Sequence, residues 1–365
     1  MTRHMIRIGS AVLVSLLATT AAPASAQPEE PPTYERAQGV TFEPVDPSVW
    51  KVIDTMAPRD ETDEYPEWHQ GVEIAPDGTV WLWGPGGIRE LGGSPIGDDP
   101  ADWQDSMSGI ISKARGFTID ADGTVWANID SKIRSWDGTT WSTPALDLTQ
   151  VVATSIDDVY AMLVEATPDG SVWAVWEIWY DEGYEYERVL ARVDGDAWTL
   201  QELTTQPRSV SSVAGMADGD TWLVAATDDD PILMYRHEGR WQATDAPAVP
   251  AWSGPATGPD GTLWMTVSRP EAPDGCDALA RLAQGAWTIH VPNSDEMCGI
   301  GLFGLEVGPD GSVWFPADGV VGYDGTEWRH YLRGVFPLDL DVASDGTVWV
   351  AAAEGVFVIR PPTVG

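Results

Sequence analysis

The chain has 365 residues, with 57 Asp and Glu against 20 Lys and Arg, so its formal net charge is -37 at pH 7. A chain this acidic repels phosphate backbones and anionic lipid surfaces, which argues against nucleic-acid binding and membrane-surface binding. The 43% share of hydrophobic residues excludes a disordered acidic tail and allows a large buried core.

Residues 1–26 have the pattern of a secretory signal peptide. Arg3 and Arg7 precede an apolar stretch, and residues 24–26 (Ala-Ser-Ala) form a small-x-small cleavage site. An uncleaved anchor is the alternative, but the apolar stretch is short for a membrane span. We therefore predict a secreted, extracellular protein without membrane insertion, in which residues 27–41, rich in Pro and Glu, form a disordered lead-in.

A five-residue motif, Asp-Gly-x-Val-Trp, recurs through the rest of the chain. Residues 122–126 (Asp-Gly-Thr-Val-Trp) are a typical copy, and residues 218–222 (Asp-Gly-Asp-Thr-Trp) are a drifted one. The motif tryptophans are Trp81, Trp126, Trp173, Trp222, Trp264, Trp314 and Trp349. They lie between 35 and 50 residues apart, which is typical of the blades of a β-propeller.

Each motif also predicts two strands, named a and b, that are joined by a tight turn. Asp-Gly between short apolar runs favours a β-hairpin, because Gly accepts a positive φ and Asp tolerates it. A third run, strand c, leads to a second turn such as Asp137-Gly138, after which another Trp opens strand d. These second tryptophans are Trp103, Trp141, Trp198, Trp241, Trp287 and Trp328.

The last repeat stops after its strand c, at residues 356–359, and lacks a strand d. Residues 48–53 (Ser-Val-Trp-Lys-Val-Ile) resemble the strand d of the preceding repeat, residues 326–331. We predict that they complete the last blade, which joins the two ends of the chain and removes an open sheet edge. The predicted fold is an all-β, seven-bladed β-propeller of four-stranded blades over residues 42–365, with tryptophans packed between the blades.

Two known families share these residues. Residues 121–138 resemble the two-component regulator propeller repeat, and residues 308–315 (Gly-Pro-Asp-Gly-Ser-Val-Trp-Phe) are equally similar to the streptogramin (virginiamycin B) lyase repeat. The first resemblance implies a domain that senses a ligand in front of a membrane span and a kinase. The second implies lyase chemistry that depends on a divalent metal and a catalytic His.

The two faces of the predicted disk differ. The a–b and c–d turns are short and form the short-turn face, whereas the longer b–c and d–a connections form the long-loop face. Function usually lies on variable loops held by a rigid scaffold, which favours the long-loop face. The candidate binding residues there are Trp68 and His69 before blade 1, and Trp176, Trp179, Tyr180, Tyr184 and Tyr186 in the b–c loop of blade 3.

Aromatic side chains of this kind stack on sugar rings, aromatic groups or cations. The alternative is a long hairpin whose aromatic residues only pack on the disk. Cys276 and Cys298, the two cysteines of the chain, also fall on the long-loop face. Export favours a disulfide between them, with two free thiols as the alternative.

Acidic residues recur on strand a, four positions before the motif Asp. They are Glu73, Glu165, Glu306 and Asp341. Strand a is the innermost strand of a propeller blade, and carboxylates in apolar segments need partners. The four are therefore candidate ligands of a Ca²⁺ or Mg²⁺ ion at the axis, the one cofactor that the sequence suggests. The alternative is that each pairs separately with a backbone group or an Arg.

Evidence for catalysis is thin. The sequence has no hydrolase elbow, zinc-protease, P-loop or dinucleotide motif, and no His spacing supports a catalytic site. His290 and His330, close to strand d tryptophans, are expected on the surface. We predict a monomer without catalytic residues that binds or senses an extracellular ligand or protein through its long-loop face. The alternatives are a metal-assisted lyase or hydrolase of the streptogramin-lyase type and an extracellular structural scaffold.

The acidity itself leads to a prediction about salt. The acidic residues are spread over all the repeats instead of one tail, so like charges repel one another across the whole surface. Salt screens such repulsion, so the melting temperature is expected to rise markedly with NaCl. Thermal unfolding from low to molar NaCl checks this, and a flat melting temperature would contradict it.

Overall fold

The computed structural model shows an all-β fold, and the residues it describes are 41–53, 71–84, 87–91, 95–96, 116–129, 131–148, 156–180, 185–203, 209–227, 230–244, 252–268, 277–292, 304–352 and 354–360. No helix in these ranges is long and apolar enough to cross a membrane. Several predictions concern residues outside these ranges, namely the signal peptide, the lead-in up to residue 40, Trp68, His69, Trp103, Tyr184 and the Cys276–Cys298 disulfide.

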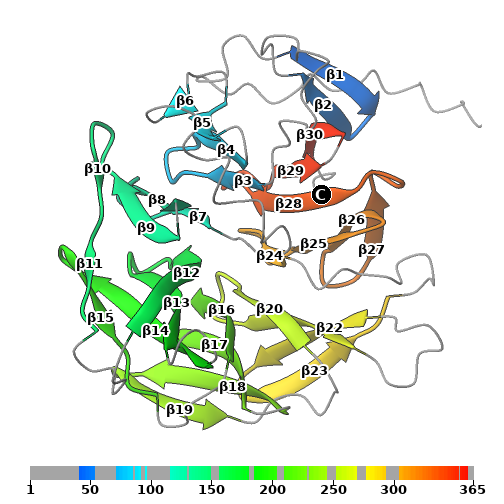
Figure 1. The fold of residues 1–365 in the computed structure, drawn as a ribbon. Coiled ribbons are helices and arrows are strands. Elements are labelled where there is room, and N and C mark those ends of the chain that lie inside the picture. Colours follow the sequence, from blue (N-terminus) through cyan, green and yellow to red (C-terminus); the bar gives the residue numbers. More distant parts are fainter. Residues whose placement is uncertain are drawn as a thin grey trace, which may run out of the picture.

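The described strands form seven hydrogen-bonded sheets that surround a centre (Figure 1). Blade 1 contains β3 (Gly71–Ile74), β4 (Val80–Gly84), β5 (Gly87–Glu90) and β6 (Pro95–Ile96). Blade 2 contains β7 (Phe117–Ile119), β8 (Val125–Ile129), β9 (Lys132–Trp136) and β10 (Trp141–Ser142). Blade 3 contains β12 (Ile156–Ala166), β13 (Val172–Tyr180), β14 (Glu185–Asp194) and β15 (Ala197–Leu200), with β11 (Ala145–Leu146) parallel to β15.

The remaining sheets follow in chain order. Blade 4 contains β16 (Ser209–Gly215), β17 (Thr221–Thr227), β18 (Asp230–His237) and β19 (Arg240–Thr244). Blade 5 contains β20 (Trp252–Thr257), β21 (Leu263–Ser268), β22 (Asp277–Ala283) and β23 (Ala286–His290). Blade 6 contains β24 (Glu306–Val307), β25 (Val313–Ala317), β26 (Gly319–Tyr323) and β27 (Trp328–Tyr331). Blade 7 contains β28 (Pro337–Val342), β29 (Val348–Ala352), β30 (Gly355–Ile359), β2 (Val49–Ile53) and β1 (Thr41–Asp46).

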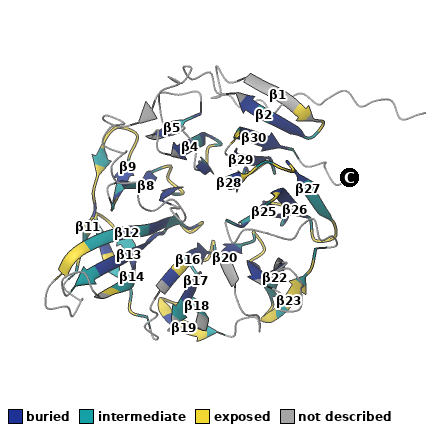
Figure 2. Ribbon diagram, turned by 45° about the vertical axis from the view of Figure 1, so that its right-hand side comes forward, coloured by how far each residue is buried: buried dark blue, intermediate teal, exposed yellow. Residues whose placement is uncertain are grey.

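The innermost strands surround the axis of the ring. Strand a of each sheet contacts strand a of the next, from β3 through β7, β12, β16, β20 and β24 to β28, which returns to β3. Figure 2 shows the same ring, with the most buried segments between and within the sheets. The predicted all-β propeller with blades of about four strands is therefore confirmed. The exact number of blades stays a prediction.

The N-terminal strand lies in the last sheet, as the sequence predicted. β2 pairs antiparallel with β30, so that Trp50 stands opposite Val358. Trp50 is 1% exposed and shares a core cluster with Trp349 and with Val72 of blade 1. β1 adds an unpredicted fifth strand on the outside of β2.

The repeated turn explains the repeated Asp. In blade 6, the Asp310 carboxylate accepts a hydrogen bond from the Ser312 N–H at 2.9 Å, and Gly311 adopts a φ of 81°. A left-handed residue at this position favours Gly, and the Asp side chain satisfies a backbone donor that the turn leaves free. The motif therefore supplies a self-contained turn, while its Trp supplies the packing between blades.

The tryptophans pack as predicted where the blades meet. Trp173 of strand b is 1% exposed and lies edge-on to Trp241 of blade 4, with 5.7 Å between ring centroids. Trp126 of blade 2 meets Trp198 of blade 3 at the same distance. Each contact therefore joins a strand b indole to a strand d indole of the following sheet.

Candidate functional site

The axis is lined by equivalent residues of the seven a strands. In every sheet the residue four places before the motif Asp stands opposite the motif Trp of strand b. These residues are Glu73, Thr118, Glu165, Ala214, Ala256, Glu306 and Asp341. Acidic or hydroxyl side chains thus occupy five positions, and the two alanines of blades 4 and 5 leave an apolar sector.

Asp341 bonds to backbone N–H groups, as in the predicted alternative in which each acid pairs separately with a backbone group or an Arg. Its Oδ2 accepts a hydrogen bond from the Ile74 N–H of blade 1 at 2.6 Å, and its Oδ1 accepts one from the Val342 N–H at 2.6 Å. Thr118 does the same between blades 2 and 3, where its Oγ1 accepts the Ala166 N–H at 3.2 Å. These side chains satisfy the inner backbone edge of the neighbouring strand a and link the blades.

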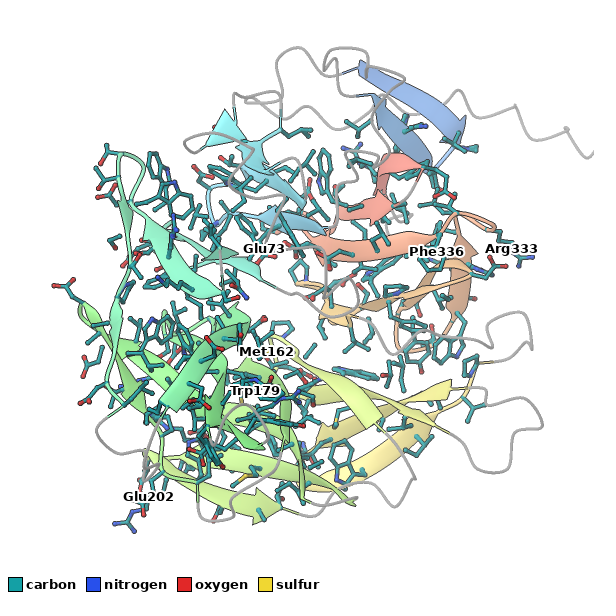
Figure 3. The ribbon with its side chains drawn as sticks, viewed as in Figure 1. Glu73, Met162, Trp179, Glu202, Arg333 and Phe336 are labelled. Carbon is teal, nitrogen blue, oxygen red and sulfur yellow. The ribbon has the colours of Figure 1, made fainter. Side chains whose placement is uncertain are left out.

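The surroundings of Glu73 favour its protonated form. Burial raises the pKa of Glu73 well above its usual value, and the negative charges of Asp341, Glu165, Asp339 and Glu306 raise it further. Figure 3 shows Glu73 near the centre of the ring. Among the residues that the structure describes, no group of three or more His, Cys, Asp or Glu side chains is arranged to hold a metal ion. The predicted Ca²⁺ or Mg²⁺ ion therefore has no preformed set of ligands there and stays a prediction.

Blade 3 is longer than the other blades and projects from the ring. The segments 156–160, 176–180 and 185–189 form what we name the blade 3 arm, which begins at the register shift between Ala161 and Leu163. The far end of β12 is exposed, whereas its part next to the ring is buried (Figure 2). The arm lies on the long-loop face, because it contains the b–c connection of its blade.

One face of the arm carries linked aromatic and charged side chains. Glu177, only 8% exposed, accepts hydrogen bonds from Trp179 Nε1 at 2.8 Å and from Arg188 Nε at 3.0 Å. Arg188 Nη2 also lies 2.9 Å from Glu177 Oε2 as an ion pair. The Arg188 guanidinium lies 5.7 Å from the centroid of the Tyr186 ring, and that ring lies 5.0 Å from the Trp179 ring.

Successive side chains along a strand point to opposite faces of the sheet, so the predicted binding residues fall on two different faces. Trp179 and Tyr186 stand opposite each other on one face of the arm, and Tyr186 is 48% exposed. Trp176 is on the other face, is 5% exposed and packs on Trp198, so it belongs to the core and offers no binding surface. Tyr180 shares the face of Trp176 by the same alternation. The list of binding residues treated this segment as a loop, whereas the pairing of its strands matches the alternative of a long hairpin, in which neighbouring aromatic residues point in opposite directions.

Two arm residues were not among the predicted binding residues. Arg188 stands opposite Glu177, and Tyr160 of β12 stands opposite Glu177 on its other side. If residues 156–160 and 185–189 had been predicted as strands, both residues would have been found, because cross-strand neighbours share a face of the sheet.

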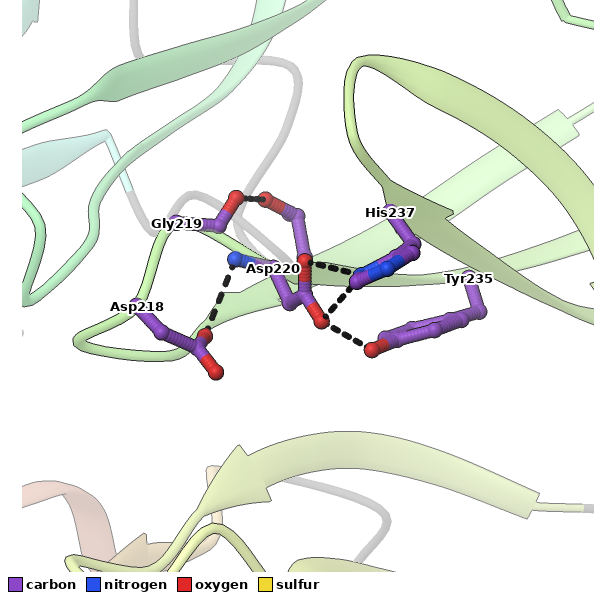
Figure 4. Close-up of polar contacts among 6 residues, drawn as sticks. Asp218, Gly219, Asp220, Tyr235 and His237 are labelled. Atoms are coloured by element: carbon purple, nitrogen blue, oxygen red, sulfur yellow. Dashed lines mark hydrogen bonds and ion pairs between the residues drawn. The ribbon is translucent and has the colours of Figure 1, made fainter.

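A second polar cluster occupies the drifted motif of blade 4 (Figure 4). Asp220 stands where six blades have Thr or Ser, and its carboxylate accepts hydrogen bonds from the Tyr235 hydroxyl and from His237 Nδ1, the latter at 2.9 Å. The His237 ring stacks on Tyr235, and Tyr235 lies on Trp222. The cluster belongs to the a–b turn and therefore to the short-turn face.

Replacing Asp220 by Asn is expected to lower the pKa of His237. The hydrogen bond and charge of Asp220 raise this pKa above its ordinary value, because both favour the imidazolium form. Without the carboxylate, the pKa is expected to fall toward the ordinary value of a histidine. NMR titration of the His237 ring measures it, and an unchanged pKa in the Asp220→Asn variant would contradict the assignment. The exposed Asp122→Asn variant of blade 2 is the control.

The other described histidines are also engaged. His290 lies half-buried between blades 5 and 6, where its Nδ1 is 3.0 Å from the Tyr323 hydroxyl, so the expectation of a surface position is wrong for it. Burial and the nearby Arg281 charge lower its pKa. His330 Nε2 lies 2.5 Å from the Asp318 carbonyl oxygen. These contacts tie both rings to the sides of blades.

Comparison with known proteins supports the fold. The sequence matches no protein-family model and no curated protein. The structure is similar to a catalytically inactive variant of virginiamycin B lyase from Staphylococcus aureus with quinupristin, at 15% identity and a TM-score of 0.54 over 80% of this chain and 94% of that one. It is similar to the extracellular domain of a putative hybrid two component system from B. thetaiotaomicron, at 12% identity and a TM-score of 0.51 over 82% of this chain and 41% of that one.

The repeat residues resemble those of streptogramin lyases and of two-component regulators, and the structure is similar to members of the same two groups. Hydrazine synthase from Kuenenia stuttgartiensis is as similar, at 12% identity and a TM-score of 0.55 over 83% of this chain and 99% of that one. Proteins with such different names share this fold, so the similarity identifies the architecture and leaves function to the site.

Proposed function

We propose that the chain is a secreted, seven-bladed propeller that binds an extracellular ligand or partner through its long-loop face, without catalysis. The observation that carries this proposal is the blade 3 arm, which presents half-exposed Tyr186 beside partly buried Trp179 on a rigid support. The ring of seven sheets and the pairing of β2 with β30 support a disk of seven blades.

Exposed apolar side chains support the choice of face. Of the six large hydrophobic residues that stand out as exposed in the described part of the chain, Ile156, Tyr186, Val291 and Phe336 lie at b–c or d–a connections. Phe336 is the most exposed of them at 63%, and Figure 3 shows it beside Arg333 on the far side of the ring from Trp179. The short-turn face, by contrast, repeats a turn that satisfies its own polar groups.

The experiment is a thermal-shift screen of the purified protein against sugars, amino acids, nucleosides and small aromatic amines. A ligand that raises the melting temperature of the wild type, but not of Tyr186→Ala, supports binding by the arm. His237→Ala, on the short-turn face, is the matched control and should keep the shift. A ligand whose shift depends on His237 and not on Tyr186 would place the binding site on the wrong face and refute the proposal.

The alternative is a metal-assisted lyase of the streptogramin-lyase type, which the similarity to virginiamycin B lyase favours. Such an enzyme needs an imidazole near a metal and carboxylates. The described histidines are tied to blade sides or to the short-turn face, so the candidate that remains is His69, which lies outside the described residues and which the sequence predicts before blade 1. Incubation with a streptogramin B and Mg²⁺, followed by mass spectrometry, tests the lyase. An opened product that is absent with His69→Ala would replace our proposal, whereas an unreactive lactone supports it.

An extracellular structural scaffold is the third possibility, and it predicts no small ligand at all. The same screen decides the matter, because a scaffold would give no shift that depends on Tyr186.

A further inference from the structure

The arm face with Trp179 and Tyr186 has the rigidity expected of a binding surface. Glu177 holds both the Trp179 indole and the Arg188 guanidinium, and Arg188 in turn covers part of Tyr186. Each of these four side chains thereby restricts the next. Little conformational entropy remains to be lost when a ligand settles on them, which favours binding by preorganised groups.

The size of this face limits the ligand. The face spans three strands about 4.8 Å apart and two residues along each strand, which gives an area of about 10 Å by 7 Å. A protein partner normally covers about 800 Å² on each side, which is far more. A single ring, or two linked rings, fits the area.

Charge limits the ligand further. The Tyr186 ring is already covered by a guanidinium, so a second cation would meet like charge there. Exposed Asp157 and Asp158, together with the acidic chain as a whole, repel anions. A flat aromatic ligand gains most binding free energy in a concave pocket that covers both of its faces. An open sheet face covers only one face of such a ligand, which disfavours it here. A neutral ring with one apolar face and polar edges meets all three conditions.

We propose that the blade 3 arm binds a neutral sugar ring of a glycan, with Trp179 and Tyr186 stacked on the apolar face of the sugar. This inference rests on the proposed function and adds the class of ligand. A guanidinium has five N–H donors, and the Nε and Nη2 donors of Arg188 face Glu177, so the others can bond to sugar hydroxyls. Asp158, opposite Trp179, offers acceptors at the other end of the row.

The test is affinity electrophoresis of the full chain in gels that contain xylan, glucomannan or mixed-linkage glucan as neutral probes. Polygalacturonate and chitosan are the anionic and cationic probes, and tryptamine in solution is the aromatic one. At least one neutral glycan should retard the wild type. Isothermal titration with its hexasaccharide should show binding weakened about three- to tenfold in Tyr186→Ala and in Trp179→Ala, as expected for the loss of one stacking contact.

Two further variants separate binding from folding. Phe336→Ala removes an even more exposed aromatic residue from the same face of the disk and should bind as the wild type does. Arg188→Lys keeps the charge but not the planar fork, so it should weaken binding while its melting temperature stays near that of the wild type.

The outcomes separate this inference from the proposed function. Retardation by a neutral glycan that is weakened in Tyr186→Ala supports both. Binding of chitosan or tryptamine that depends on Tyr186, without binding of any neutral glycan, refutes the sugar and leaves the arm as the binding site. Glycan binding that is unchanged in Tyr186→Ala and Trp179→Ala refutes the sugar site on the arm, and a response to none of the probes refutes it as well.

Discussion

Replacing Trp50 by Ala is expected to lower the free energy of unfolding by about 3–5 kcal/mol, the cost of removing a buried Trp. Trp50 is 1% exposed and lies in the core cluster between blade 7 and blade 1. The segment that holds it, β2, also connects the N-terminal part of the chain to the C-terminal strands of the sheet, because it pairs with β1 on one side and β30 on the other. Losing its packing therefore weakens the noncovalent closure of the ring as well as one core.

Urea unfolding followed by far-UV circular dichroism measures this effect. Trp287→Ala is the matched control, because Trp287 holds the corresponding position on strand d of blade 5 and is only half-buried. Its substitution should cost clearly less. If Trp50→Ala were no more destabilising than Trp287→Ala, the closure between β2 and β30 would contribute nothing special to stability.

Replacing Glu73 by Gln is expected to stabilise the protein at neutral pH. The folded state raises the pKa of Glu73 above the value of 4.5 that applies without the protein environment, through burial and four neighbouring carboxylates. The folded protein therefore holds this proton more tightly than the unfolded chain, and stability falls as pH rises from about 4.5 through the raised pKa. Gln carries no charge at any pH and removes this loss.

Melting temperatures of the wild type and of Glu73→Gln, measured from pH 4 to pH 8, check the sign. The two proteins should melt alike near pH 4, where the carboxyl is protonated in both states, and the variant should melt higher at pH 7. Glu202→Gln, at an exposed position labelled in Figure 3, is the control and should show no such divergence. A variant that melts lower than the wild type at pH 7 would show that ionised Glu73 stabilises the axis.

The blade 3 arm shows where prediction from sequence was incomplete. The sequence indicated an aromatic, acidic segment on the long-loop face, and the structure places Trp179 and Tyr186 on an exposed face there. It left a binding loop and a long hairpin as alternatives, and the list of candidate binding residues grouped Trp176 with them. Alternation along β13 buries Trp176 against Trp198 and leaves Trp179 partly accessible on the opposite face, a distinction that composition cannot make.

The axis gives a second example. The spacing of the motif placed Glu73 and Asp341 at equivalent positions, and the register with the motif tryptophans agrees. Whether such carboxylates bind a metal or a backbone group depends on the neighbouring blade. Asp341 meets the Ile74 N–H because strands 267 residues apart in the chain lie side by side at the seam of the ring.

The sequence by itself determined the repeat, the strands, the turns and the closure of the ring, because these follow from local patterns: Gly at a left-handed turn, Asp next to it and Trp at a fixed offset. Only the tertiary structure decided which side chains are available. Glu177 with Arg188, Asp220 with His237 and Asp341 with Ile74 are pairs across strands or blades. Their partners depend on how neighbouring strands and sheets are aligned, which the local pattern of the turn and its Trp does not contain.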